Sequence, residues 1–193
     1  MDKAQLLGTG AELARTFCDA NGLPLPPIEV YEASRWRFAS TCAYYRPQRI
    51  HIAPTKCAHI GTGGMAWSYP GYIIDRTPYG VIQHELGHHV DYLMSGAKGS
   101  YGGDFSVAMR RDVREPKITN YCPNDWEWFA EIFRLFVTNS DLLRLLRPRA
   151  YDAIVTAGFM PVVARPWQEV LRAAPLRTQE QAAKRVDGIV NSA

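Results

Sequence analysis

Apolar residues recur at helical spacing in the middle of the chain, at Val81, Leu86, Val90 and Leu93. Thr77 is a suitable N-cap, and Pro78 suits the first position of a helix. Ser95 and Gly96 follow the last apolar position and are typical of a helix end. The pattern therefore predicts a helix that begins at Pro78 and ends before Ser95.

The same spacing predicts helices elsewhere in the chain. An N-terminal amphipathic helix is expected within residues 1–20, with an apolar face of Leu6, Leu7, Leu13, Ala14 and Phe17. A second central helix is expected within residues 121–136, where the apolar positions are Phe129, Ile132, Phe133 and Phe136. The C-terminal third is expected to be helical, with a Leu-rich turn capped by Ser140, a segment at residues 151–157, and starts at Pro166 and at a Thr178–Gln181 capping box.

Shorter stretches of β-favouring residues precede the central helices. After a proline-rich turn, a short strand is predicted over residues 28–31. Residues 41–53 are predicted to form a strand or hairpin, and Pro47 breaks its middle or places it at a sheet edge. An edge strand there could bind a peptide as an added strand. Residues 54–76 are expected to form a long loop whose aromatic residues line an active site or anchor the loop, namely Trp67, Tyr69 and Tyr72.

The composition is that of one globular domain. The chain has 193 residues, of which 47% are hydrophobic and 21% are charged, so it can bury a substantial core. Its formal net charge of +3 is too small to indicate nucleic acid binding. No apolar stretch is long enough to cross a membrane, and the N-terminus lacks the apolar core of a signal peptide. A cytoplasmic protein is therefore expected, with non-classical release or virion association as the alternatives, and with neither nucleic acid nor membrane as a partner.

The cysteines and arginines add little to this picture. The cysteines show no Cys-x-x-Cys spacing, so a structural zinc site is not indicated, and free thiols are expected at Cys18, Cys42, Cys57 and Cys122. The arginines of the second half lie among acidic residues and are expected on solvated helix faces; they are Arg110, Arg111, Arg114, Arg134, Arg144, Arg147 and Arg149. A preference for an acidic substrate is the other use that these arginines could have.

The first central helix contains His-Glu-Leu-Gly-His at residues 84–88. Histidines four residues apart lie on one helix face, so His84 and His88 can direct ring nitrogens at the same metal ion. Glu85 borders that face, where it can take a proton from metal-bound water. A helical His-Glu-x-x-His is the arrangement that zinc peptidases use. The alternative is a helix with two ordinary histidines and a solvated glutamate.

Other polar residues near the motif are weaker candidates. His89 is rotated about 100° from His88, and a surface or supporting role is expected for it. Asp91 is expected to serve helix packing or to lie beside the ligands, and Asp104 is a less favoured alternative ligand. Two further histidines, His51 and His59, have no spaced partners and are assigned no chemistry.

The second central helix offers two glutamates, Glu127 and Glu131, one turn apart among aromatic residues. Burying carboxylates beside aromatic surface is costly unless they meet a cation or a histidine. Without the upstream motif, two solvated surface glutamates would be the preferred interpretation. A zinc peptidase, however, needs a third protein ligand besides two histidines, and this helix can supply it.

These segments resemble the gluzincins, the zinc peptidases with a glutamate ligand. The likeness covers residues 77–143 and is greatest to the catalytic domain of anthrax lethal factor and to small bacterial and phage-borne metallopeptidases. There, a His-Glu-(Phe/Leu)-Gly-His-x-Val-Asp helix precedes a tyrosine and a Glu-x-Phe-Ala-Glu-x-Phe-Arg-Leu helix. The resemblance implies Glu127 as third zinc ligand, Glu131 as partner of a zinc histidine, and Tyr121 as stabiliser of the tetrahedral intermediate. Tyr121 lies one residue closer to Glu127 than in lethal factor, and Tyr101 is the alternative.

Together these observations predict a single α+β, zincin-like domain over residues 1–193. Residues 1–76 would form the N-terminal helix, the sheet and the loop, and residues 77–193 the active-site helix, the glutamate helix and the C-terminal helices. A small, mostly antiparallel sheet is expected to pack on the active-site helix.

The expected function is that of a zinc-dependent endopeptidase with one Zn²⁺ per chain, held by His84, His88 and Glu127. Glu85 would be the general base, and the substrate would be a peptide or protein. Two alternatives remain: a regulatory peptidase of the antirepressor-cleaving kind, and a catalytically silent zincin-fold binding or structural protein, such as a virion component. Glu85 and Tyr121 weigh against the silent protein, because a structural zinc site needs neither.

Overall fold

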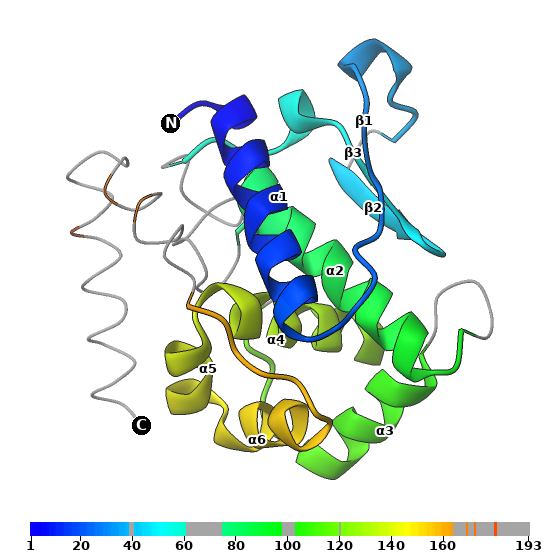
Figure 1. The fold of residues 1–193 in the computed structure, drawn as a ribbon, viewed down its shortest axis with the longest axis vertical. Coiled ribbons are helices and arrows are strands. Elements are labelled where there is room, and N and C mark those ends of the chain that lie inside the picture. Colours follow the sequence, from blue (N-terminus) through cyan, green and yellow to red (C-terminus); the bar gives the residue numbers. More distant parts are fainter. Residues whose placement is uncertain are drawn as a thin grey trace.

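The computed structural model describes residues 1–38, 41–60, 75–97, 103–119 and 121–163, together with residues 169, 172 and 180. In this part of the chain the protein is an α+β fold in which helices predominate (Figure 1). The helices are α1 (Lys3–Ala20), α2 (Pro78–Met94), α3 (Asp104–Val113), α4 (Asp125–Thr138), α5 (Ser140–Leu146) and α6 (Pro148–Thr156). The strands are β1 (Ile28–Val30), β2 (Ala43–Arg46) and β3 (Arg49–Ile52), and short 3-10 turns lie at Ala33–Arg35 and Pro54–Lys56.

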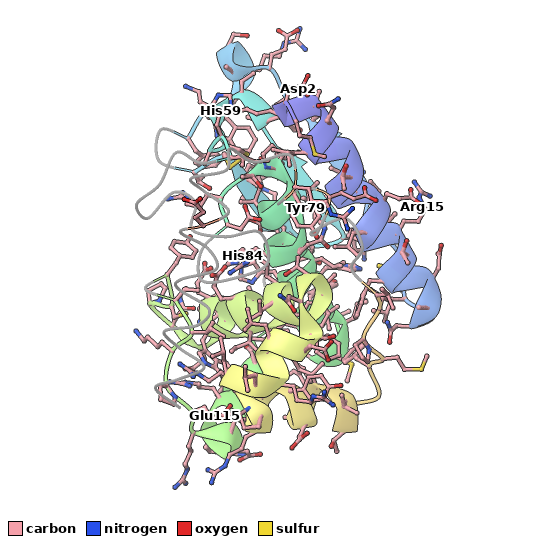
Figure 2. The ribbon with its side chains drawn as sticks, turned by 90° about the vertical axis from the view of Figure 1, so that its left-hand side faces the viewer. Asp2, Arg15, His59, Tyr79, His84 and Glu115 are labelled. Carbon is pink, nitrogen blue, oxygen red and sulfur yellow. A yellow bond between two sulfur atoms is a disulfide. The ribbon has the colours of Figure 1, made fainter. Side chains whose placement is uncertain are left out.

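Helix α2 lies at the centre and packs against α1, α4 and the sheet (Figure 1). Small residues permit its close contacts. A Cβ atom at Gly87 would come within 2.8 Å of the Cα atom of Ala130 in α4. On the other side, a Cβ atom at Gly10 of α1 would lie 2.9 Å from the Cα atom of Tyr79, in the first turn of α2 (Figure 2). Any larger side chain at Gly87 or Gly10 would push the helices apart.

The ends of the central helices agree with the prediction. Helix α2 begins at Pro78, the Thr77 side chain accepts a hydrogen bond from the Gly80 amide, and Ser95 is the C-cap. In α4, the four predicted apolar positions are all fully buried, at Phe129, Ile132, Phe133 and Phe136. The N-terminal helix is confirmed as α1, which begins with an Asp2–Gln5 capping box. These features depend on nearby residues, which is why the sequence pattern identifies them.

The sheet has the strand order β1–β3–β2, so β2 lies at its edge. Strands β2 and β3 form an antiparallel hairpin, whereas β1 runs parallel to β3. The sheet is therefore mixed, and the expectation of a mostly antiparallel sheet was wrong. Strands of three or four residues show the same alternation of side chains in either direction, so the sequence pattern does not distinguish the two pairings.

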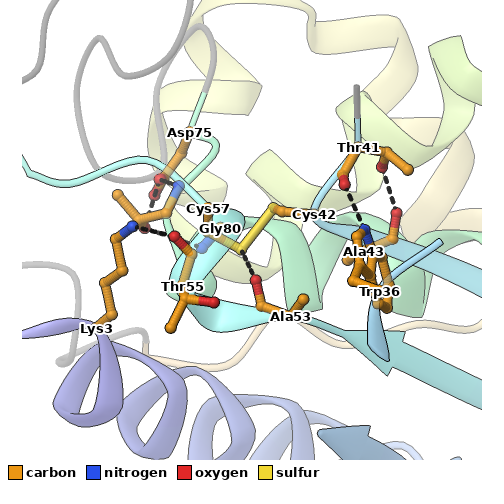
Figure 3. Close-up of a disulfide and its surroundings, with 11 residues drawn as sticks. Lys3, Trp36, Thr41, Cys42, Ala43, Ala53, Thr55, Cys57, Asp75 and Gly80 are labelled. Carbon is orange, nitrogen blue, oxygen red and sulfur yellow. Dashed lines mark hydrogen bonds between the residues drawn. A yellow bond between two sulfur atoms is a disulfide. The ribbon is translucent and has the colours of Figure 1, made fainter. Parts of the chain in front are cut away.

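A disulfide joins Cys42 to Cys57, with the two Cα atoms 5.0 Å apart (Figure 3). The hairpin brings the two cysteines together, because the Ala53 amide donates a hydrogen bond to the Cys42 carbonyl and the chain then turns back through Pro54–Lys56. The expectation of free thiols was wrong for this pair, and it holds for the buried Cys18 and Cys122. The pairing depends on the long-range fold, and the cysteine spacing gives no sign of it.

The C-terminal region is helical as far as residue 156. Asn139, not Ser140, caps α5, since its side chain accepts a hydrogen bond from the Leu142 amide. The predicted helix at residues 151–157 begins earlier, at Pro148. The expected features at Pro166, Thr178 and Gln181, and the loop aromatics Trp67, Tyr69 and Tyr72, lie outside the described residues. Among the described helices, none has the length and apolar character needed to cross a membrane.

Candidate metal site

Helix α2 presents His84 and His88 one turn apart, and the His84 side chain contacts α4 (Figure 2). The two imidazole ring centroids are 4.9 Å apart, and less than a tenth of each residue is exposed. Glu85 is 6% exposed and lines the same cleft as both histidines. We call this cleft, which is also lined by Tyr121, Glu127 and strand β2, the metal-site cleft.

Helix α4 brings Glu127 to the two histidines. The Asn124 side chain accepts a hydrogen bond from the Glu127 amide, which fixes Glu127 in the first turn of the helix. Its Oε2 atom lies 2.9 Å from Nε2 of His84 and 3.5 Å from Nε2 of His88. One donor atom from each of these residues lies within 4.8 Å of the other two. The group could therefore hold a metal ion.

Glu131 lies behind this group, one turn further along α4. Its Oε1 atom is 2.8 Å from Nδ1 of His84, the nitrogen that faces away from Glu127. Arg134 donates two hydrogen bonds to the Glu131 carboxylate, each 3.1 Å long. Arg134 is fully buried, so the expectation that it lies on a solvated helix face was wrong. The Glu131–Arg134 pair holds the far side of His84 in place.

The carboxylates around His84 make the site attractive to a cation. Burial opposes a charge on His84, but its hydrogen bonds to Glu127 and Glu131 outweigh burial and raise its pKa well above the ordinary value. For Glu131, burial would raise the pKa, but the charge of Arg134 and the contact with His84 bring it down to about 2. Burial raises the pKa of Glu85, although the two neighbouring histidines partly offset this. Glu131 is therefore charged at neutral pH, and Glu85 is a stronger base than an exposed glutamate.

Tyr121 borders the cleft from the loop before α4. Its ring centroid is 5.6 Å from that of His84, and 45% of the residue is exposed. Partial burial and the charges of Glu127 and Glu85 raise its pKa to about 12, so its hydroxyl stays protonated and can donate a hydrogen bond. The alternative tyrosine, Tyr101, lies outside the described residues.

The remaining candidates take structural positions. His89 is buried, and its ring nitrogens lie 3.1 Å from the Tyr45 hydroxyl and 3.0 Å from the Pro24 carbonyl. Asp91 is buried and accepts a hydrogen bond from the Ser106 amide in the first turn of α3. Three residues belong to no metal-binding group among the described residues: the exposed Asp104 and His59, and His51, which lies in β3.

Asp75 is a site-lining residue that the sequence reasoning missed. It is 3% exposed, lines a pocket with His84 and Glu131, and accepts hydrogen bonds from the Thr77 amide and hydroxyl. Burial raises its pKa to about 6, although Arg134 and Thr77 act against this. A Cβ atom at Gly80 would collide with the Asp75 carboxyl carbon at 2.4 Å. Asp75 was missed because it lies at the end of a predicted loop. The Asp-x-Thr-Pro sequence directly before α2 is the feature that could have identified it.

Strand β2 forms the wall of the metal-site cleft opposite α4, and every residue of the strand, from Ala43 to Arg46, lines the cleft.

Comparison of the chain with protein-family models, curated proteins and solved structures finds no match.

Proposed function

We propose that the protein is a zinc-dependent endopeptidase with a zincin-like arrangement of α2, α4 and the sheet. The observation that carries the proposal is the convergence of His84, His88 and Glu127 from two helices, with Glu85 in the same cleft. Two histidines and one glutamate are a ligand set of catalytic zinc sites, which leave a fourth position for water or substrate.

The spacing of the donor atoms supports zinc. Two nitrogen or oxygen ligands of a tetrahedral zinc ion lie about 3.3 Å apart, given bond lengths near 2.0–2.1 Å. The Glu127 oxygen is 2.9 Å and 3.5 Å from the two histidine nitrogens, and all three donor atoms lie within 4.8 Å of one another. Zinc bound there would lower the pKa of a coordinated water to about 7 and polarise a peptide carbonyl.

Glu85 has the position and the basicity for proton transfer. Its carboxylate lines the cleft beside the proposed ligands but is not one of them, so it is available to accept a proton from the attacking water. The same carboxylate would then pass that proton to the nitrogen of the departing amine. Its raised pKa brings it closer to neutral pH, where a general base and acid works best.

Tyr121 and strand β2 supply the other interactions that peptide hydrolysis needs. The protonated Tyr121 hydroxyl would donate a hydrogen bond to the oxygen on which negative charge develops. Strand β2 is an edge strand that lines the cleft. An extended peptide could pair with its outer edge by displacing the contacts that the Tyr45 amide makes with Glu85 and the Ala43 carbonyl with the Thr41 hydroxyl. The substrate would then lie between β2 and the two helices.

The direct test is cleavage of a degenerate peptide library by the zinc-loaded protein, read by mass spectrometry. The proposal predicts cleavage by the native protein, and none by Glu85→Gln at unchanged zinc content. The control is Arg15→Gln, prepared in the same way, because Arg15 is exposed on α1 and does not line the metal-site cleft. This variant should cleave normally. Zinc binding without cleavage of any peptide would instead favour a silent binding protein.

A further inference from the structure

The face of the sheet that carries Tyr44 and His51 supports a cluster of aromatic rings. Tyr44 and His51 pair across β2 and β3, and their rings stack with centroids 4.6 Å apart. The segment after the first 3-10 turn adds Trp36 and Phe38, whose ring centroids lie 5.3 Å and 4.9 Å from that of Tyr44. A 2.7 Å hydrogen bond from Trp36 Nε1 to the Thr41 carbonyl holds this segment in place. These rings form the wall of an open cleft of about 660 Å³.

Arginines line the same cleft, and we call it the arginine–aromatic cleft. Arg35, Arg37 and Arg46 are exposed there, and no carboxylate of the described residues forms an ion pair with any of them. Glu29, the acidic residue next to His51, is already bound by Arg49 and by the Tyr31 hydroxyl. The cleft is therefore positively charged, and an anionic group entering it would meet three guanidinium groups without competition.

One polar atom within this cluster lacks a partner. His51 is 93% buried and lines the cleft, and its Nε2 atom has no hydrogen-bond partner among the described residues. The other ring nitrogen, Nδ1, is 3.1 Å from the Tyr31 hydroxyl. A buried ring nitrogen without a partner is unfavourable. This nitrogen has almost no exposed surface of its own, so a ligand in the cleft would meet the arginines and the aromatic rings.

The arginine–aromatic cleft adjoins the metal-site cleft. Phe38, Tyr44 and Arg46 line both. Tyr44 and Arg46 are two apart in β2, so they project from the same face of the strand, and the Arg46 guanidinium lies 5.5 Å from the Tyr44 ring centroid. In a peptide added to the β2 edge, every second side chain would project from that face. Those side chains would point toward the arginines.

We infer that the arginine–aromatic cleft is a specificity subsite that receives an acidic side chain of a peptide lying along β2. The inference rests on the proposed function for its substrate class. A peptide is favoured over a nucleic acid because the cleft opens onto a strand edge, where an extended backbone can pair. The aromatic wall suits the apolar part of a Glu side chain, and the arginines suit its carboxylate.

Binding to a peptide array tests the subsite without needing turnover. The array holds degenerate peptides in which each position in turn is fixed as Glu, Gln or Lys, and the probe is full-length, zinc-loaded Glu85→Gln protein. We expect about tenfold tighter binding for Glu than for Gln at one or more positions, weakening as salt is added. Arg46→Gln, and separately the Arg35→Gln/Arg37→Gln pair, should remove most of that preference. Arg15→Gln makes the same charge change on α1, where the side chain is exposed, and should keep the preference.

Equal binding of the Glu and Gln peptides, or no peptide binding, overturns the subsite. So does a preference that survives both arginine variants. Tight binding of a single-stranded oligonucleotide that Arg46→Gln abolishes, without any Glu preference, would assign the cleft to nucleic acid instead. Parallel cleavage assays with the native protein separate this inference from the proposed function. If the function fails, no peptide is cut although the Glu preference remains; if the subsite fails, Glu and Gln peptides are cut equally.

Discussion

The candidate metal site lies between a helix pair, α2 and α4, and a strand edge, β2, and these two walls are held by different contacts. The helices touch through Gly87 and Ala130, and the buried Glu131–Arg134 pair fixes the ligand face. Strand β2 is held by its hairpin partner and by the Cys42–Cys57 disulfide. It is also held by Tyr45, whose hydroxyl contacts Nδ1 of His89 in α2.

Under the proposed function, this difference would separate chemistry from recognition. The helix wall carries all the proposed ligands and the base, and His84, Glu85 and His88 are each less than a tenth exposed, so it would hold one fixed geometry. The strand wall presents the side chains of Tyr44 and Arg46 to the clefts, and on its outer edge the Tyr45 amide contacts Glu85 and the Ala43 carbonyl accepts a hydrogen bond from the Thr41 hydroxyl. Changes to the helix wall should therefore affect metal binding and turnover, and changes to the strand wall should affect substrate choice or stability. The predictions below test that division.

The largest effect is expected from Glu127→Ala. It removes one of three proposed ligands and leaves two histidines, which should hold little zinc at micromolar protein concentration. Zinc titration followed by elemental analysis measures this, with Asp104→Ala as the control because Asp104 is exposed outside the site. Full zinc retention in Glu127→Ala would show that another group supplies the third ligand.

Tyr121→Phe should lower turnover by roughly 10²–10³ and leave zinc content and folding unchanged, because it removes one donor to the developing oxyanion. Steady-state kinetics on a cleaved library peptide gives the value. If Tyr101→Phe has the larger effect, the tyrosine has been misassigned.

Glu131→Ala should weaken zinc affinity or activity by roughly 10–100-fold, since Glu131 contacts His84 and is not one of the three proposed ligands. The loss should be smaller than that from Glu127→Ala in the same titration. A larger loss from Glu131→Ala would reverse the roles of the two glutamates.

The smallest effect on metal binding is expected from the strand wall. Replacing Cys42 and Cys57 by Ser opens a loop with a sequence separation of 15 and should lower the free energy of unfolding by about 3 kcal/mol. Zinc affinity should not change. Urea unfolding and zinc titration of the double variant measure both, and Cys18→Ser controls for loss of a free thiol. A large loss of zinc affinity would show that β2 supports the ligands after all.

The same division explains what the sequence could predict. The span of α2, the pairing of His84 with His88, and the place of Glu127 in the first turn of α4 follow from helical spacing and caps, which are local. The parallel pairing of β1, the disulfide, and the burial of Arg134 depend on segments far apart in sequence. Arg134 was misjudged because arginines on helices are usually solvated; only its distance of three residues from Glu131 on an apolar helix hinted at a buried pair.

The most direct test of the account is the metal content of the purified protein and its relation to cleavage. Elemental analysis should find one zinc ion per chain. A chelator should remove the zinc together with peptide cleavage, and added zinc should restore both, with lower thermal stability in the zinc-free form because the metal joins α2 to α4. Protein that contains no zinc and takes up none when it is supplied would contradict the proposed function.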